Sequence, residues 1–319
     1  MGIYLDYNAS APIDERVLDV MVDVYKNTYG NADSRTHEYG DHARQIVENA
    51  RIQVASLLSV NAGEVFFTSG STESNNIAIR GLIDFAKATG KMHVITSTIE
   101  HKAVLETVKS LAGEGFQVDL VNPDENGIVC YEDIMKLVRD DTLLVSLMHA
   151  NNETGTIQPI EKIGEELSNK GILFHVDATQ SCGKLVPELK KAKYDMLSLS
   201  AHKLCGPQGI GALILKKKRY KLPPIKAITY GGQQEHGLRP GTIPVALVAG
   251  LGEACRLAEI EYKNNIESLI EKKELVKKII EESRLTFHYN GSQDYCMPNT
   301  LNVSFDGIES EALMLSTKQ

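Results

Sequence analysis

A lysine stands at the end of an apolar segment that has the character of a buried β-strand. The segment covers residues 196–200, and His202 and Lys203 follow it before the chain turns at Gly206-Pro207. A lysine is costly to bury, and a buried lysine loses its proton readily. A neutral lysine amine attacks carbonyl compounds and forms a Schiff base. An isolated lysine at a strand end is more commonly a surface residue, so the rest of the chain must decide.

A second motif is suited to binding a phosphate group. In FTSGSTESNN, a short apolar strand is followed by Ser-Gly-Ser-Thr, which includes Ser71 and Thr72, and then by a helical pattern. Backbone N–H groups and hydroxyls at a helix N-terminus form an anion site. Serine and threonine are also common helix caps, so the motif alone leaves both interpretations open.

Polar residues follow two more apolar segments and end a third. His101 follows TSTIE, Asn152 lies in the turn NNETG, and HVDATQS contains Asp177 and Gln180. A loop histidine and an asparagine turn need no ligand. An aspartate at the end of a buried strand, however, is unfavourable unless it meets a positive partner. A protonated pyridine nitrogen is such a partner.

These residues together predict one pocket that binds pyridoxal 5′-phosphate (PLP). Polar groups that follow separate parallel strands converge at the carboxyl edge of the sheet. They supply a phosphate cradle, a histidine that can stack on a ring, an acid for a pyridinium and a lysine for a Schiff base. Ser200 and His202, next to the lysine, complete the set.

The apolar periodicity predicts the elements that position these groups. We expect helices at 14–26, 43–58, from about 73, 102–111, 131–138 and 160–168, and strands at 65–68, 93–98, 116–121, 143–149, 172–176, 196–200 and 211–215. Alternating strands and helices predict an α/β fold with a mostly parallel sheet that is covered on both faces.

The pattern changes after Pro244. A long charged helix at 245–284, strands at 285–289 and 300–305 and a short helix from Ser310 follow. We therefore expect a large PLP-binding domain over 14–244. We expect residues 1–13 and 245–319 to form a smaller α+β domain that is incomplete at its C-terminus.

Composition excludes several classes of function. The chain of 319 residues has 34 lysines and arginines against 42 acidic residues, a net charge of −8, so direct nucleic-acid binding is not expected. No signal peptide and no membrane-spanning segment are expected. The five cysteines form no CxxC pair, which favours reduced thiols and a cytoplasmic location. The histidines show no metal-binding spacing.

Eight motifs in order carry a family resemblance that runs from Tyr4 to the end of the chain. They are YLDYNASAP, GNADSRTHEYG, FTSGSTESNN, STIEHKAVLE, MHANNETGTIQPI, HVDATQSCGK, SLSAHKLCGPQGIGALI and GGQQEHGLRPGT. This set resembles the cysteine desulfurases of the NifS/IscS type, class V aminotransferases with the PLP-dependent transferase fold (fold type I).

The resemblance implies a role for each site residue. Lys203 would form the Schiff base, and Asp177 would pair with the pyridine nitrogen. Gln180 and Asn152 would approach the ring hydroxyl, and His101 would stack on the ring and serve as acid or base. The phosphate would be held by Ser71, Thr72, Ser200 and His202, and by Thr242 of RPGT from a neighbouring subunit, which implies a homodimer.

The resemblance also implies the reaction. Lys203 removes the Cα proton of bound L-cysteine, and a cysteine thiolate on a mobile loop attacks the substrate sulfur. L-alanine leaves, and a protein persulfide remains. Sulfur-acceptor proteins then serve iron–sulfur cluster assembly or the sulfur modification of tRNA or DNA.

The chain departs from the family pattern in its nucleophile. The family's cysteine and a later arginine follow NTLNVSFDGIESEALMLS, and we expect both to lie outside these 319 residues. Cys205 is the only cysteine near Lys203, but free cysteines are commonly buried packing residues, and Cys182 is less suited still. Cys130, Cys255 and Cys296 are expected to be structural, and His236 replaces an arginine of many relatives.

Two alternatives remain open from the sequence. One is a different class V PLP enzyme, a selenocysteine lyase or an aminotransferase, with the same cofactor residues. The other is a truncated relative that binds PLP without turnover.

Overall fold

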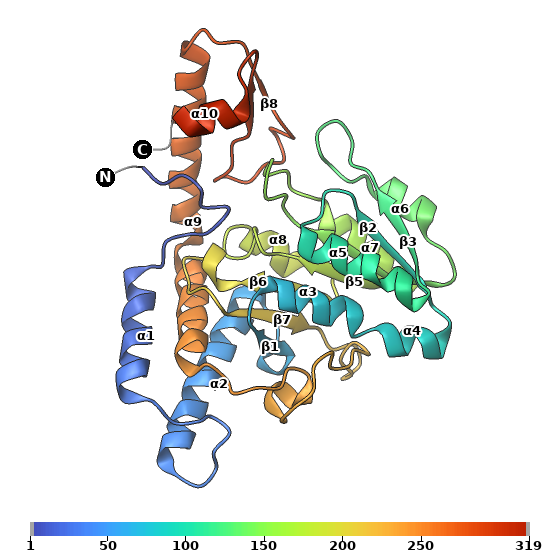
Figure 1. The fold of residues 1–319 in the computed structure, drawn as a ribbon, viewed down its shortest axis with the longest axis vertical. Helices are drawn as coiled ribbons and strands as arrows, with labels where there is room; N and C mark the ends of the chain where they lie inside the picture. Colours follow the sequence, from blue (N-terminus) through green and yellow to red (C-terminus); the bar gives the residue numbers. More distant parts are fainter. Residues whose placement is uncertain (1–2, 317–319) are drawn as a thin grey trace.

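A computed structural model describes residues 3–316 and contains a seven-stranded sheet between layers of helices (Figure 1). The strand order is β1-β7-β6-β5-β4-β2-β3. The strands are β1 (Val65–Thr68), β2 (His93–Ser97), β3 (Gln117–Val121), β4 (Thr142–Met148), β5 (Leu173–Asp177), β6 (Met196–Ser200) and β7 (Gly211–Leu215).

Every strand of this sheet except β7 runs in the same direction. The neighbours from β3 to β6 pair in parallel, whereas β7 pairs antiparallel with both β6 and β1. The carboxyl ends of β1, β6, β5, β4 and β2 therefore meet at one edge. The predicted α/β fold with a mostly parallel sheet is confirmed.

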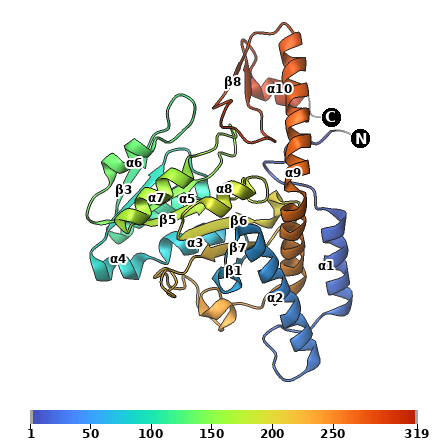
Figure 2. The same cartoon turned by 180° about the vertical axis from the view of Figure 1, so that it is seen from behind.

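Helices cover both faces of the sheet (Figures 1 and 2). They are α1 (Glu15–Asn27), α2 (Glu38–Leu58), α3 (Ser71–Arg80), α4 (Ile83–Thr89), α5 (Lys102–Ser110), α6 (Tyr131–Leu137), α7 (Ile160–Lys170), α8 (Val186–Lys191), α9 (Val245–Glu282) and α10 (Ser310–Ser316). Buried strand residues alternate between the layers, because successive side chains of a strand point to opposite faces. Val94 and Leu144 pack with α3 and α5, whereas Ile95 and Val145 belong to the core formed with α2, α7 and α9.

Helix boundaries differ from expectation where capping chemistry is involved. Helix α2 begins at Glu38 rather than at 43, because the His37 Nδ1 accepts a hydrogen bond from the Gly40 N–H at 3.1 Å. A Cβ on Gly40 would lie 2.3 Å from the Ser34 carbonyl oxygen, so the loop closes tightly over this first turn. The short helices α4 and α8 were not predicted.

Helix α9 joins two parts of the molecule. Its buried residues lie between Ala246 and Leu257, where it packs into the same core as α1 and α2. Its second half extends beyond the sheet, beside the hairpin β8 (Phe287–Tyr289) and β9 (Val303–Phe305) and beside α10 (Figure 1). The domain division at residue 245 stays a prediction.

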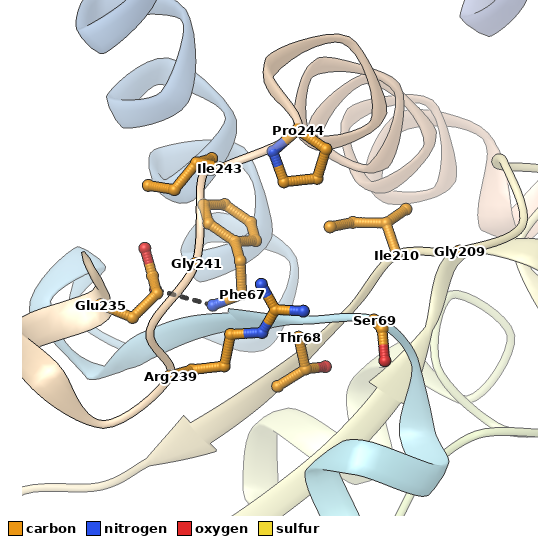
Figure 3. Close-up of a pocket in the computed structure, with 10 residues that line it drawn as sticks. All are labelled: Phe67, Thr68, Ser69, Gly209, Ile210, Glu235, Arg239, Gly241, Ile243 and Pro244. Atoms are coloured by element: carbon orange, nitrogen blue, oxygen red, sulfur yellow. Dashed lines mark hydrogen bonds between the residues drawn. The ribbon is translucent and has the colours of Figure 1, made fainter. Parts of the chain in front are cut away.

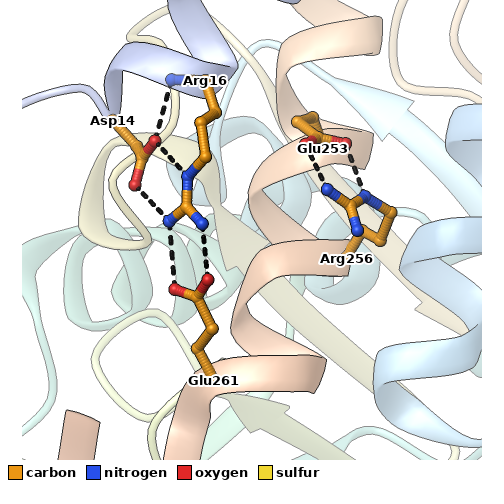
Figure 4. A network of polar contacts seen from close by, with 5 residues as sticks. All are labelled: Asp14, Arg16, Glu253, Arg256 and Glu261. Carbon is orange, nitrogen blue, oxygen red and sulfur yellow. Dashed lines mark hydrogen bonds and ion pairs between the residues drawn. The ribbon is translucent and has the colours of Figure 1, made fainter.

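An ion-pair network fixes α1 against α9 (Figure 4). Arg16 Nη1 lies 2.5 Å from Glu261 Oε1, and Arg16 Nη2 lies 2.8 Å from Asp14 Oδ2. Arg256 pairs with Glu253 one turn away along α9. Among residues 3–316, none of the helices combines the length and the apolar character that crossing a membrane requires.

Candidate active site

The strand-end residues lie in rows at the carboxyl edge of the sheet. Gly211 of β7 pairs with Thr68 on one side and with Ser200 on the other. Asp177 of β5 pairs with Met148 of β4 and with Ser198 of β6. The register thus brings the ends of separate strands together, as the sequence predicts.

The start of α3 forms a cradle beside Ser200. Gly70 precedes Ser71 and adopts a φ of +151°, a conformation that a side chain rarely permits. A Cβ placed on Gly70 would lie 3.7 Å from the Ser200 Oγ, so this hydroxyl faces the first turn of α3. Because α3 has no side-chain cap at Gly70, its first N–H groups are open to an anion.

The segment that contains Thr242 runs past this cradle. Arg239 donates through Nε to Glu73 Oε1 at 3.1 Å, and Glu73 also accepts from the Ser69 N–H. Figure 3 shows this segment across β1, with Arg239 near Thr68 and Ser69. Thr242 itself is exposed.

Asp177 is a buried carboxylate whose partners are neutral. It is 5% exposed and accepts hydrogen bonds from Asn75 Nδ2 at 2.8 Å and from the N–H and hydroxyl of Thr179. No cation among residues 3–316 lies within ion-pair distance of Asp177. A buried charge of this kind favours a positive ligand, so the residues present fit a protonated pyridine nitrogen.

Lys203 lies in a short 3₁₀ turn, Ala201–Lys203, directly after β6. Its Nζ donates to the backbone oxygen of Asn8, which also accepts from Gln180 Nε2 at 2.9 Å. Burial lowers the pKa of Lys203, against the raising effect of the carboxylates of Asp6, Asp177 and Glu153. The lowered pKa increases the share of neutral amine, the form that attacks a carbonyl group.

Asn8 joins three distant parts of the chain at this point. Its Nδ2 donates to the Asn152 carbonyl oxygen at 3.1 Å and to the Thr300 Oγ1 at 2.9 Å. Asn299 Nδ2 donates to the Asn8 Oδ1 at 2.9 Å. Asn8 lies in the motif YLDYNASAP, but its role cannot be predicted from the sequence, because nothing local marks an asparagine as a long-range bridge.

Three predicted residues lie at the edge of this cluster. His101 is exposed and caps α5, where its Nδ1 accepts from the Ala103 N–H at 3.1 Å. The Asn152 side chain donates to Glu153 Oε1 at 2.6 Å. Within the described part of the chain, the side chains of His101, Asn152 and Thr242 form no direct hydrogen bond with Lys203. Their roles toward a cofactor stay predictions.

A buried glutamate, which sequence reasoning missed, ties two strand ends together. Glu100 Oε1 accepts from Ser97 Oγ at 2.5 Å and from the Met148 N–H at 3.0 Å. Burial raises the pKa of Glu100 to about 8. The carboxyl group therefore fixes the end of β2, which precedes His101, to the end of β4.

The cysteines near Lys203 are poorly suited to act as thiolates. Burial raises the pKa of Cys205, and it raises the pKa of Cys182 to about 12. A thiol needs a lowered pKa to be a good nucleophile near neutral pH. Neither thiol therefore has the lowered pKa of a good nucleophile, and the position of the nucleophile stays a prediction. Among residues 3–316, no group of histidine, cysteine and acidic side chains could hold a metal ion.

Comparisons with known proteins agree with this geometry. The model of the family Aminotransferase class-V matches residues 3–319. Cysteine desulfurase IscS of Vibrio vulnificus (strain YJ016) is 45% identical over 322 residues, which cover 100% of this chain and 78% of that protein. Cysteine desulfurase IscS of a Neisseria meningitidis serogroup C strain is 42% identical over 318 residues, 99% of this chain and 78% of that protein.

Solved structures share the fold of almost the whole chain. The crystal structure of DndA from Streptomyces lividans superposes with a TM-score of 0.89 at 42% identity and covers 99% of this chain and 88% of its own. A NifS-like protein has a TM-score of 0.92 at 40% identity, with 99% and 85% covered. The structure of SspA in complex with cysteine has a TM-score of 0.84 at 36% identity, with 99% and 87% covered. The chain belongs to the class V aminotransferase family and, within it, to the cysteine desulfurases of the NifS/IscS type.

Proposed function

We propose that this protein is a PLP-dependent cysteine desulfurase. It converts L-cysteine and a protein thiol into L-alanine and a protein persulfide, from which sulfur passes to acceptor proteins. The observation that carries the proposal is a partly buried lysine and a buried aspartate at one sheet edge. Lys203 has a lowered pKa and Asp177 has only neutral partners, and the chain belongs to a family of PLP enzymes.

Most of the site residues bind the cofactor, whereas Lys203 transfers a proton. Bound PLP supplies an electron-withdrawing ring that makes the Cα proton of the amino acid acidic. Asp177, held by Asn75 and Thr179, keeps a positive ring nitrogen in place. The Lys203 Nζ, once free of a covalent bond, accepts the Cα proton. The hydroxyls of Ser71, Thr72 and Ser200 and the first turn of α3 hold the phosphate.

The remaining predicted residues complete the proposal. His101 stacks on the ring and serves as acid or base, Gln180 and Asn152 approach the ring hydroxyl, and His202 assists at the phosphate. Thr242 is exposed on a segment next to the cradle, which supports its predicted reach into a second copy of the chain. The protein then works as a homodimer, and we place it in the cytoplasm. We assign the thiolate to neither Cys182 nor Cys205, because burial raises the pKa of both.

The test uses Lys203→Ala in the full-length protein loaded with PLP. The wild type should show the visible absorption of a lysine–PLP linkage and should release alanine from L-cysteine. The variant should lose both, because no other amine replaces Nζ at this position. The exposed Lys191 of α8 provides the control, and Lys191→Ala should keep the absorption and the alanine release. Visible absorption that survives in the Lys203 variant would disprove the lysine assignment.

A further inference from the structure

A second lysine lies directly beneath Lys203. The Lys184 Nζ donates to the backbone carbonyl oxygens of Gln180 at 3.1 Å and of Lys203 at 3.0 Å. The side chains of these two residues both donate to the Asn8 backbone oxygen. One ammonium group thus holds the backbones of two site residues whose side chains meet at a single acceptor.

Three carbonyl oxygens of the turn that carries Lys203 accept hydrogen bonds from other parts of the chain. The His202 carbonyl oxygen accepts from the Ala11 N–H and the Cys205 carbonyl oxygen accepts from the Asp14 N–H, both at 2.9 Å. The Lys203 carbonyl oxygen, between them, accepts from Lys184. Buried carbonyl groups are nearly always paired, so Lys184 supplies a partner that this position needs.

The turn that contains Gly183 and the turn that contains Lys203 also pack closely against each other. Gly183 has a φ of +74°, and a Cβ added there would lie 1.9 Å from Leu204 Cδ1. Cys205 has a positive φ of 55°, a conformation that non-glycine residues adopt rarely and only with support from their surroundings. A shift of Lys184 would therefore be transmitted to the Lys203 turn.

The charge of Lys184 acts on Lys203 as well. Lys184 as a whole is partly exposed, but burial of its ammonium and, to a lesser extent, the nearby Lys203 together lower its pKa to about 8. Coulomb repulsion is mutual, so a positive Lys184 disfavours a positive Lys203. The other ionisable groups that face this pair are Cys182 and Cys205 on the Lys184 side, and Asp6, Glu153, Asp177 and His202 on the Lys203 side.

We propose that Lys184 is a positioning residue that holds the Lys203 turn in place and favours the neutral Lys203 amine. The inference rests on the proposed role of Lys203 as the Schiff-base lysine. Lys184 forms no bond with the substrate in this role and acts only through Lys203 and Gln180.

The test measures the Lys203 amine directly. Full-length protein freed of cofactor is mixed with PLP at a series of pH values, the adduct is trapped with borohydride, and the modified peptide is quantified by mass spectrometry. The wild type should be modified at Lys203, with a rate that rises through the pKa of its amine. Lys184→Met removes charge and donors and should move this midpoint upward by about 0.5 to 1 pH unit, which is a roughly threefold to tenfold lower rate at a fixed pH below it.

Hydrogen exchange reports on the turn itself. The amides of Leu204 and Gly206 donate to the Ala201 carbonyl oxygen at 2.8 and 2.9 Å, and they should exchange faster in Lys184→Met. Lys184→Gln keeps a donor without the charge, so it should shift the midpoint while it retains part of the protection. Lys191→Met, an exposed control on α8, should match the wild type in both measurements.

The outcomes separate the two proposals. If wild-type Lys203 is not modified by PLP, the proposed function fails. If Lys203 is modified but both Lys184 variants overlay the wild type, the positioning role is rejected. If neither variant folds, as judged by circular dichroism, Lys184 is a residue of general stability, and the inference is rejected as well.

Discussion

At the scale of single residues, the site keeps its charged groups in contact with neutral partners. Lys203 donates to a backbone oxygen, and Asp177 accepts from an amide, a hydroxyl and a backbone N–H. A buried charge without a counter-ion raises the free energy of the folded protein. The same arrangement leaves each charge available to a ligand, as expected of an active site.

Asp177→Asn tests whether the charge of Asp177 lowers stability but is needed for catalysis. In the protein without cofactor, the variant should be at least as stable as the wild type, because a buried charge is removed. Asn75 Oδ1 is buried and has no hydrogen-bond partner in the structure, so the two amides can pair after a flip. With PLP bound, kcat for alanine formation should fall roughly 10²–10³-fold, as when one electrostatic contact to a reacting group is lost.

Asp195 provides the matched control for this variant. It is also buried, but it pairs with Lys218 at 2.7 Å and accepts from the Phe174 N–H at the opposite end of the sheet. Asp195→Asn should therefore lower stability and leave kcat unchanged. Urea unfolding and steady-state kinetics on both variants provide the comparison. A loss of stability in Asp177→Asn equal to that in Asp195→Asn would contradict the prediction.

At the scale of elements, a buried ion pair fixes the segment that leads to Thr242. Arg51 of α2 forms two hydrogen bonds with the Glu235 carboxylate, at 2.8 and 2.9 Å, and lies over the Phe67 ring. Glu235 also accepts from the Phe67 N–H at 2.7 Å and has a positive φ of 47°. Helix α2, strand β1 and this segment thus meet at one carboxylate.

Glu235→Gln should be strongly destabilising. The change removes the buried counter-ion of the Arg51 guanidinium and leaves only the exposed Glu48 carboxylate beside it, at 3.3 Å. The loss of one partner of a buried pair costs about 3–5 kcal/mol. The free energy of unfolding in urea measures this cost. The exposed pair between Lys193 and Glu165, 2.9 Å apart, offers a control in which Glu165→Gln should have little effect. Equal effects of the two substitutions would show that Glu235 does not act through a buried pair.

At the scale of the whole molecule, buried titratable groups determine how stability depends on pH. Burial lowers the pKa of His175 to about 4 and that of His149 to about 3, from 6.5. His175 lies between Ser146 and Ser198, with ring nitrogens 2.8 and 2.9 Å from their hydroxyls. Between pH 6.5 and 4, the unfolded chain binds protons that the folded protein does not, so stability falls as the pH falls.

Glu100 acts in the opposite direction. Its pKa is raised from 4.5 to about 8, so between these values the folded protein holds a proton that the unfolded chain releases. This contribution to stability is fully present below pH 4.5 and is lost as the pH rises toward 8. In the window from about pH 4.5 to 6.5, the two histidines and Glu100 therefore oppose each other.

Two variants should change the slope of stability against pH in opposite directions. Within that window, His175→Gln should flatten the slope by up to about 1.4 kcal/mol per pH unit, because one proton of difference between the states disappears. Glu100→Gln, which preserves the shape of the neutral acid, should steepen the slope by a similar amount. Urea titrations at pH 4.5, 5.5 and 6.5 measure both effects. Parallel curves for wild type and variants would refute the assigned protonation states.

Much of this architecture could be predicted from the residues alone. Short apolar runs located all seven strands of the main sheet, and the polar residues at their ends indicated PLP chemistry. Apolar runs carry this information because a strand that is covered on both faces has few polar positions. The capping of α2 by His37 was not predicted, since a single contact leaves no periodic pattern, and the short helices α4 and α8 were also missed.

The partners of the site residues depended on the tertiary structure. Asn75 and Asp177 are 102 positions apart, and Asn8 and Lys203 are 195 apart. No local pattern marks such pairs, because they form only where packed helices and sheet register bring distant turns together. Residue types along the chain thus indicated the chemistry, whereas packing decided which neutral groups and which second lysine surround the Lys203 amine.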